Sequence, residues 1–229
     1  MRLSDFQVAV GECEIVSFDI FDTLVERDCL LPSEIFIRMG KRIAGKSGAS
    51  SFCKARIEAE RKARRESKTG EVTLAEIHVI LAAKLGTDAA QTAALEVEEE
   101  LKSVRSKASV RPLYEWAKAN RRVVLTTDMY LPSDVIRQML SKCGIDGYEA
   151  LFLSCECGAD KVSGRLFEVM VDSLNVSNFE IAHVGDTVSA DVRGAGLAGV
   201  LPVFIPRRAM LRRHVLQKLR GLWMRLFVK

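Results

Sequence analysis

The stretch EIVSFDIFDTL, residues 14–24, decides the fold of this chain. Its apolar run, Ile15 to Phe18, is typical of a buried strand in a parallel sheet, and it ends at the carboxylate of Asp19. A buried strand has no structural use for an acid at its carboxyl end, which is where open α/β sheets bind their ligands. The stretch therefore predicts an α/β fold with a functional site built around Asp19.

Strand and helix signals alternate along the later part of the chain. Apolar runs predict strands at 122–126, 150–153, 180–184 and 200–205, and amphipathic patterns predict helices at 132–142, 164–174 and 188–197. Strands that alternate with helices form parallel sheets covered by helices on both faces. The length of 229 residues suits one such domain with a modest insertion.

The region between the first two predicted strands carries helix signals and no strand signal. Its signals are Pro32 and Gly45, which bracket a first helix; Ser50 and Ser51, which cap a second at 52–67; the Thr73–Glu76 capping box and Gly86, which bound a third; and Asp88, which caps a fourth. We therefore divide the chain into an α/β core (1–29 and 109–206), a small helical cap (30–108) and a basic C-terminal helix (207–229).

The basic charge of the chain resides in its C-terminal segment, 207–229. This segment holds eight basic residues and no acidic one, so the remaining residues, with 26 basic and 30 acidic side chains, carry a net charge of −4. Its apolar residues recur at helical spacing, which is typical of a helix that lies on an anionic membrane surface or docks on an acidic partner. Packing on the acidic body of the chain, or between two copies in a dimer, is the structural alternative, and all these interpretations stay open.

Composition favours a cytoplasmic protein, with peripheral attachment to the inner membrane face as the alternative. No apolar run approaches the roughly 20 residues that span a bilayer, and the N-terminus lacks the pattern of a signal peptide. The six cysteines do not resemble a disulfide framework. No nucleic-acid-binding motif is present, so we expect no nucleic-acid partner.

Four groups of polar residues lie at or near the ends of the predicted strands, centred on Asp19, Thr127, Lys161 and Asp186. Because the carboxyl ends of parallel strands meet at one edge of the sheet, we expect these residues to share one crevice. Asp19 and Asp186 suit Mg²⁺, and Asp19 suits nucleophilic attack on phosphorus. Thr127 and Lys161 would hold the negative charge of the non-bridging oxygens.

These motifs together resemble the haloacid dehalogenase (HAD) superfamily of hydrolases, which use an aspartate nucleophile. The resemblance spans 14–205, and the superfamily's four motifs fall on Asp19 and Thr23, on Thr127, on Lys161 with Phe167, and on Gly185 and Asp186 with Asp191. It implies a Rossmann-like core with a helical cap. More narrowly, FDIFDTL, TDMYLP, KVSGRLFE and FCKARIEAERKAR resemble a bacterial branch of HAD hydrolases associated with surface-polysaccharide genes and glycosyltransferases.

The resemblance implies a Mg²⁺-dependent phosphatase that acts on a phosphorylated small molecule, such as a sugar phosphate or an activated sugar, through a phospho-aspartyl intermediate. It also implies that Mg²⁺ is held by Asp19, the backbone carbonyl of Phe21, Asp186 and Asp191, although Asp191 can equally brace the helix that follows. We expect Thr23, within the first motif, and Asp128, directly after the second, to contact the substrate.

Phe21 departs from the family pattern, because HAD phosphatases usually place an aspartate there to protonate the leaving oxygen and later activate water. A positioned acid or base contributes about 10²–10⁴-fold, so its loss would slow a phosphatase rather than abolish the reaction. We expect Asp22 to brace the turn, and its substitution for the missing acid is the alternative. The second hypothesis is a catalytically weak HAD-fold module that works by binding, beside a glycosyltransferase or a membrane surface.

A dehalogenase or a phosphonatase is a third hypothesis. A dehalogenase needs no Mg²⁺ and would leave Asp186 without a use, and no lysine stands out as the Schiff base that a phosphonatase requires.

Two further features have open roles. Arg56, Glu60 and Arg64 share one helix face, which predicts either a solvated ladder of ion pairs or a face that binds the substrate anion. We expect His183, on a strand, to be a hydrogen-bonded core histidine.

Overall fold

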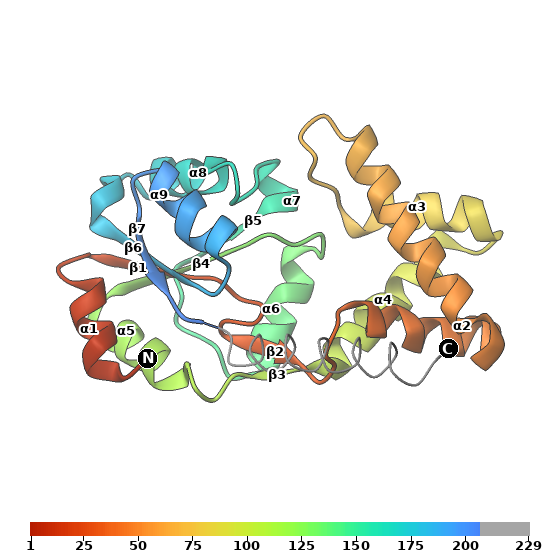
Figure 1. Cartoon of the computed structure of the whole chain (residues 1–229), viewed down its shortest axis with the longest axis horizontal. Coiled ribbons are helices and arrows are strands. Elements are labelled where there is room, and N and C mark those ends of the chain that lie inside the picture. Colours follow the sequence, from red (N-terminus) through yellow and green to blue (C-terminus); the bar gives the residue numbers. More distant parts are fainter. Residues whose placement is uncertain (207–229) are drawn as a thin grey trace, which may run out of the picture.

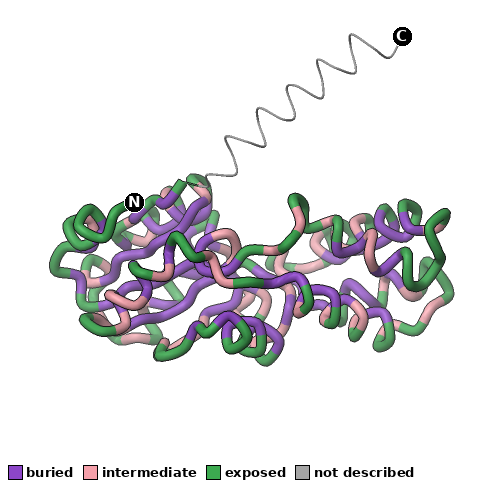
Figure 2. Tube along the Cα trace, turned by 90° about the horizontal axis from the view of Figure 1, so that it is seen from below, coloured by how far each residue is buried: buried purple, intermediate pink, exposed green. Residues whose placement is uncertain are grey.

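The computed structural model describes residues 1–206, so the basic helix predicted at 207–229 lies outside the described residues. The described chain forms an α/β core and a helical cap that lie side by side (Figures 1 and 2). Among the helices of the described part, none is both long enough and apolar enough to cross a membrane.

The core is built on a sheet of five parallel strands in the order β5-β4-β1-β6-β7. They are β1 (Ile15–Phe18), β4 (Arg122–Thr127), β5 (Ala150–Leu153), β6 (Ile181–Gly185) and β7 (Leu201–Phe204). All five were predicted from the sequence, and the fold class is confirmed. From β1 the chain proceeds to β4 and β5 on one side and then to β6 and β7 on the other. The direction of winding therefore reverses at β1, where open sheets bind ligands.

Helices cover both faces of this sheet (Figure 1). One face carries α1 (Leu3–Val10), α5 (Arg111–Asn120) and α6 (Ser133–Lys142), and the other carries α8 (Arg165–Leu174) and α9 (Ala195–Leu197). Three short elements complete the core, namely α7 (Ser154–Cys157), η1 (Asn178–Glu180) and the π-helical turn η2 (Val188–Gly194). Within β1, Val16 and Phe18 pack under the first face and Ile15 under the second, which is why the strand is apolar throughout.

The cap consists of α2 (Ser33–Glu66), α3 (Leu74–Leu85) and α4 (Ala89–Ser103), which pack around an apolar cluster of their own. Gly45 interrupts α2 with a φ of 69° and a ψ of −178°, a conformation that favours glycine. The predicted break at Gly45 is therefore confirmed, but the helix resumes at once rather than after a cap at Ser50 or Ser51. The capping box at Thr73 is present.

A two-stranded antiparallel ribbon, β2 (Val25–Arg27) and β3 (Val104–Ser106), connects the cap to the core (Figure 1). The expectation of no strand within 30–108 is wrong at β3, because a three-residue strand is too short to show a period of two in the sequence. Arg27 of the ribbon donates two hydrogen bonds to Glu100 of α4, at 2.7 and 3.0 Å, and so fixes the cap at its base.

Candidate active site

Asp19 lies directly after β1 and is surrounded by the side chains that the sequence analysis grouped with it. The Lys161 ammonium, in the loop before α8, lies 2.7 Å from Asp19 Oδ1. The Thr127 hydroxyl, at the end of β4, lies 3.4 Å from the same oxygen. Asp186 follows β6, and all four residues are at most 5% exposed. The reversal of winding at β1 thus brings the predicted residues into one buried site.

Three carboxylates of this site could hold a metal ion. Asp19, Asp186 and Asp191 each offer one oxygen, and these oxygens lie within 4.8 Å of one another. Burial raises the pKa of Asp19 to about 7 although the Lys161 ammonium opposes this, and the two other carboxylates raise it further. One lysine therefore does not offset the negative charge, and the oxygen donors fit a hard divalent cation such as Mg²⁺.

Asp191 is held by hydrogen bonds at both of its oxygens. Its Oδ1 accepts from Lys161 at 2.5 Å and lies 3.2 Å from His183 Nε2, and its Oδ2 accepts from the backbone N–H groups of Asp186 and Thr187 at 3.0 and 2.8 Å. Burial alone would raise the pKa of Asp191, but His183 and Lys161 hold it below its ordinary range. These bonds hold Asp191 against Lys161, His183 and the turn that leads into η2, and its role as a Mg²⁺ ligand stays a prediction.

Gly185 is required beside Asp191 for reasons of space. A Cβ atom at Gly185 would lie 2.2 Å from Asp191 Cγ, so any other residue would displace the carboxylate.

His183, two residues earlier, is fully buried, and burial lowers its pKa, so the ring is neutral. Its Nδ1 lies 2.9 Å from Ser17 Oγ, which leaves Nε2–H to donate to Asp191. The expected core histidine is confirmed, but its contact with Asp191 was not predicted.

Phe21 has a structural role beside the β2–β3 ribbon that joins the cap to the core, which we call the hinge ribbon. Its ring is partly buried in the core cluster, with the Arg27 guanidinium carbon 4.3 Å from the ring centroid. Asp22 has a φ of 63°, and its backbone bonds to Val25 and to the Lys107 ammonium, so it lies in the turn that leads into the hinge. Thr23 is fully buried, and its hydroxyl makes no hydrogen bond within residues 1–206. Its contact with substrate stays a prediction.

The role predicted for Arg56 in binding a substrate anion is corrected by the structure. Arg56 is fully buried, and its Nε and Nη2 each lie 2.6 Å from an oxygen of Glu96 on α4. Its Nη1 donates to Glu60, so each of the three guanidinium nitrogens already pairs with a carboxylate of the cap rather than with a substrate anion. The expected ion-pair ladder with Glu60 is present, but its Arg56 end is buried rather than solvated, and Arg64 extends it to Glu71 at 3.3 Å. Substrate binding by Arg64, which is partly exposed, stays a prediction.

The cap touches the core at the loop that follows Thr127. Ser154 Oγ lies 2.5 Å from Glu71 Oε2 of the cap and accepts the backbone N–H of Met129 at 3.0 Å. Leu74 of the cap donates its N–H to the carbonyl of Tyr130 at 2.8 Å. These contacts place the cap loop that carries Glu71 against the rim of the Asp19 site.

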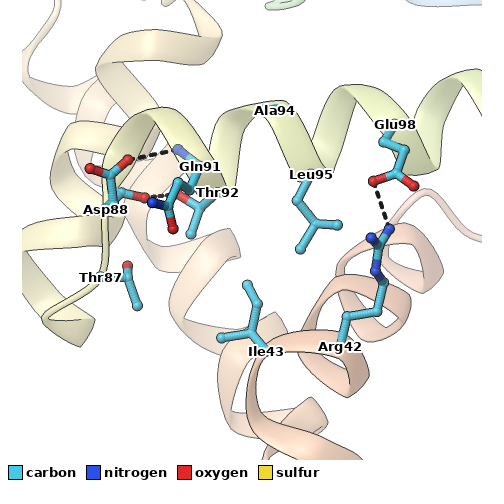
Figure 3. A pocket seen from close by; sticks show the side chains of 9 residues that line it. All are labelled: Arg42, Ile43, Thr87, Asp88, Gln91, Thr92, Ala94, Leu95 and Glu98. Carbon is cyan, nitrogen blue, oxygen red and sulfur yellow. Dashed lines mark hydrogen bonds and ion pairs between the residues drawn. The ribbon is translucent and has the colours of Figure 1, made fainter.

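A separate groove lies within the cap and shares no residue with this site (Figure 3). It is lined by Arg42, Ile43, Thr87, Asp88, Gln91, Thr92, Ala94, Leu95 and Glu98. Arg42, its cationic residue, is paired with Glu98 at 2.9 Å, and Asp88 caps α4 by accepting the N–H of Gln91. The charged groups Arg42, Asp88 and Glu98 are thus paired within the cap, and the groove lacks the combination of lysine and clustered carboxylates that surrounds Asp19.

Two sequence comparisons match this chain. A family model described as haloacid dehalogenase-like hydrolase matches residues 13–199. A stretch of 75 residues is 40% identical to a phosphoserine phosphatase from Thermus thermophilus. That stretch covers 32% of this chain and 30% of the phosphatase, so the similarity to this relative is local.

Solved structures with the same fold cover most of the chain. YfnB from Bacillus subtilis, described as an HAD hydrolase bound to magnesium, has a TM-score of 0.61 at 15% identity and covers 90% of this chain and 100% of its own. L-2-haloacid dehalogenase from Xanthobacter autotrophicus has a TM-score of 0.63 at 14% identity and covers 90% and 83%. An HAD phosphatase from Thermococcus onnurineus has a TM-score of 0.59 at 18% identity and covers 85% and 87%. At such identities the likeness shows the fold alone.

Proposed function

The chain belongs to the haloacid dehalogenase-like hydrolase family, and on that premise we propose that it is a Mg²⁺-dependent phosphatase. Its substrate would be a phosphorylated small molecule, such as a sugar phosphate or an activated sugar. The observation that carries the proposal is the pairing of Asp19 with Lys161 at 2.7 Å inside a cluster of carboxylates that one lysine does not neutralise. A haloacid dehalogenase has no use for such a cluster.

In this mechanism a carboxylate oxygen of Asp19 attacks phosphorus, and the bond to the leaving oxygen breaks. Water then hydrolyses the phospho-aspartyl intermediate and restores the carboxylate. Thr127 and Lys161 donate hydrogen bonds to the non-bridging oxygens, where negative charge gathers. Mg²⁺, held by Asp19, Asp186 and the carbonyl of Phe21, would neutralise charge on the phosphoryl group and the carboxylates. Asp191 keeps Lys161 in position through its bond to the ammonium.

The proposal is tested by phosphate release from a panel of phosphorylated small molecules, with Mg²⁺ and with a chelator. Asp19→Asn keeps the shape of the side chain but removes the nucleophile, so it should lower the rate by at least about 10⁴-fold. Thermal unfolding of the variant shows that the fold is retained. Phosphate release that persists in Asp19→Asn would sink the proposal.

A binding module is the second candidate, favoured by Phe21, which cannot donate a proton. The two candidates differ in their response to beryllium trifluoride, which mimics a phosphoryl group on a carboxylate. A reactive Asp19 should give a rise in melting temperature that needs both Mg²⁺ and beryllium trifluoride. A binding module should show no rise, and Asp19→Asn should show none under either candidate.

The location and partners of the protein are a separate part of the proposal. We place it in the cytoplasm, with a glycosyltransferase as a functional partner and with 207–229 binding an acidic surface, either of an anionic membrane or of a protein. The contact with an acidic surface is supported by the eight basic residues of that segment and the absence of acidic ones. The glycosyltransferase partner rests only on the resemblance to a bacterial branch of the family. Co-sedimentation with anionic vesicles, with and without 207–229, tests the membrane contact. Equal binding by both chains would exclude a membrane role for the segment.

A further inference from the structure

Phe21 stands at the position where HAD phosphatases usually carry an aspartate that protonates the leaving oxygen, and a phenylalanine cannot donate a proton. Phe21 packs its ring beneath Arg27, and Arg27 is in turn paired with Glu100. A phosphatase of this kind releases an alkoxide unless an acid protonates the leaving oxygen, and it needs a base for the attacking water. Another side chain must therefore perform this role if the reaction is efficient.

The position of the leaving oxygen limits where that side chain can lie. The residues that would contact the transferred phosphoryl group are buried, with Asp19 5%, Thr127 1% and Lys161 3% exposed. Substrate enters from solvent, and the leaving oxygen lies in line with Asp19 on the opposite side of phosphorus. The proton donor therefore has to stand at the solvent side of these three residues, on the rim of the site.

Asp128 occupies this rim. It directly follows Thr127 and is exposed, in contrast to the buried residues beneath it. Its Oδ1 accepts the backbone N–H of Lys161 at 3.0 Å, so the carboxyl group is tied to both residues that flank Asp19. Its Oδ2 makes no hydrogen bond with any residue in 1–206 and is available to a substrate.

The surroundings of Asp128 suit proton transfer near neutral pH. Removal of water by the neighbouring protein raises its pKa to about 6, although the Lys161 ammonium opposes this shift. The carboxylates of Glu71, from the cap, and Asp160, from the loop before α8, raise it further. Acid catalysis is most efficient when the pKa lies near the working pH, and at pH 7 roughly a tenth of the groups with such a pKa are protonated.

We infer that Asp128 is the general acid and base of this site and replaces the aspartate absent at Phe21. The inference rests on the phosphatase function proposed above. As the Asp19 oxygen bonds to phosphorus, the bond to the leaving oxygen breaks and that oxygen takes the proton of the Asp128 carboxyl group. The Asp128 carboxylate then takes a proton from water as the water oxygen bonds to phosphorus, and the bond from phosphorus to Asp19 breaks.

Glu71 is the competing carboxylate on the same rim, and it offers the matched control. Its Oε2 bonds to the Ser154 hydroxyl, and its Oε1 accepts from Arg64 at 3.3 Å, so both oxygens already have partners. Asp128→Asn keeps an oxygen that can accept the N–H of Lys161, and Glu71→Gln keeps the shape of Glu71. Each variant removes one ionisable group from the rim without removing its volume.

The test compares leaving groups in a single turnover. Glycerol phosphate needs a proton on its leaving oxygen, whereas para-nitrophenyl phosphate releases a stable anion. Asp128→Asn should slow the first turnover of glycerol phosphate by about 10²–10⁴-fold but that of para-nitrophenyl phosphate by less than about tenfold. At a pH below the pKa of Asp128, where its acid form prevails in both chains, Glu71→Gln should affect both substrates alike. Equal losses with the two substrates in Asp128→Asn, or no loss with either, would overturn the assignment.

The pH profile gives a second readout. The rate with glycerol phosphate should fall above the pKa of Asp128, as the acid form is lost, and Asp128→Asn should remove this alkaline limb. Glu71→Gln should move the limb to lower pH, because removal of a neighbouring negative charge lowers the pKa of Asp128. An unchanged limb in Asp128→Asn would contradict the inference. A wild-type chain without Mg²⁺-dependent phosphate release would instead contradict the proposed function itself.

Discussion

Two buried groups of charged side chains, one in the cap and one in the core, differ in how completely their charges are matched. In the cap, burial would raise the pKa of Glu96, but Arg56 and His78 outweigh it and lower the pKa to about 2. In the core, Lys161 lies 2.7 Å from Asp19, yet burial and the adjacent carboxylates raise the pKa of Asp19 to about 7. The pKa of a buried carboxyl group is thus lowered in the cap and raised in the core.

The difference separates a network that is complete within the protein from one that fits the proposed reactive site. The Glu96 carboxylate receives donors from Arg56 on one side and His78 on the other, so the cap network is satisfied without any ligand. The core retains an excess of carboxylates that only an added cation or a proton can offset. Uncompensated charge lowers stability, and proteins keep it where function requires it. Variants that alter one network and leave the other intact therefore test this distinction.

The largest effect on stability is expected from Arg56→Met. This change leaves Glu96 buried without its guanidinium partner, which should lower the free energy of unfolding by about 3–5 kcal/mol. The measurement is urea unfolding. The double variant Arg56→Met, Glu96→Leu removes both charges and should recover most of the loss, because an apolar pair can replace a buried ion pair. A loss below about 1 kcal/mol in the single variant would show that the network contributes little.

The dependence of stability on pH should have opposite signs in the two networks. The folded-state pKa of Glu96 is lowered to about 2, so its contribution is present above the ordinary pKa and is lost as pH falls through the acid range. The loss is on the order of 3 kcal/mol. Asp19, whose pKa is raised to about 7, should instead favour the folded state at low pH and lose this contribution as pH rises towards neutrality.

Urea unfolding without Mg²⁺, across the acid range, separates these contributions. The acid-side loss should be absent from the Arg56→Met, Glu96→Leu variant, and the decline towards neutral pH should be absent from Asp19→Asn. If Asp19→Asn leaves the profile near neutrality unchanged, the carboxylates of the core are already matched and the contrast between the networks fails.

A smaller effect is expected from Mg²⁺ itself. A cation that binds only the folded chain at 100 times its dissociation constant should add about 2.7 kcal/mol to the free energy of unfolding. The gain should disappear in Asp186→Asn and persist in the Arg56→Met, Glu96→Leu variant, since only the first removes a carboxylate of the core. Equal gains in both variants would place the Mg²⁺ site elsewhere.

Much of the core could be predicted from the sequence because its signals are local. Each strand is a short apolar run, and the site residues follow those runs directly, so parallel topology alone brings Asp19, Thr127 and Asp186 together. Gly45 and the Thr73 capping box likewise act through their immediate neighbours. The helices α1 and α5 were not predicted, although α5 has Pro112 near its start.

The errors concern contacts between residues that are far apart in the chain. Substrate binding by Arg56 was left open as an alternative because its partner, Glu96, lies 40 residues away on another helix. The hydrogen bond from Ser154 to Glu71 joins residues that are 83 positions apart, and no sequence pattern predicts it. The position of Phe21 beneath Arg27 likewise depends on how the hinge ribbon folds back. Sequence patterns thus located the residues of the candidate site but not the partners that hold the cap.

The most direct measurement of the central claim is detection of phosphate on Asp19 itself. The protein is mixed with Mg²⁺ and a phosphorylated substrate, quenched in acid during the first turnover, digested, and examined by mass spectrometry. We predict a phosphorylated peptide that contains Asp19, that forms only with Mg²⁺, and that is absent from Asp19→Asn. Phosphate release from substrate without this modification, or modification of another residue, would contradict the account.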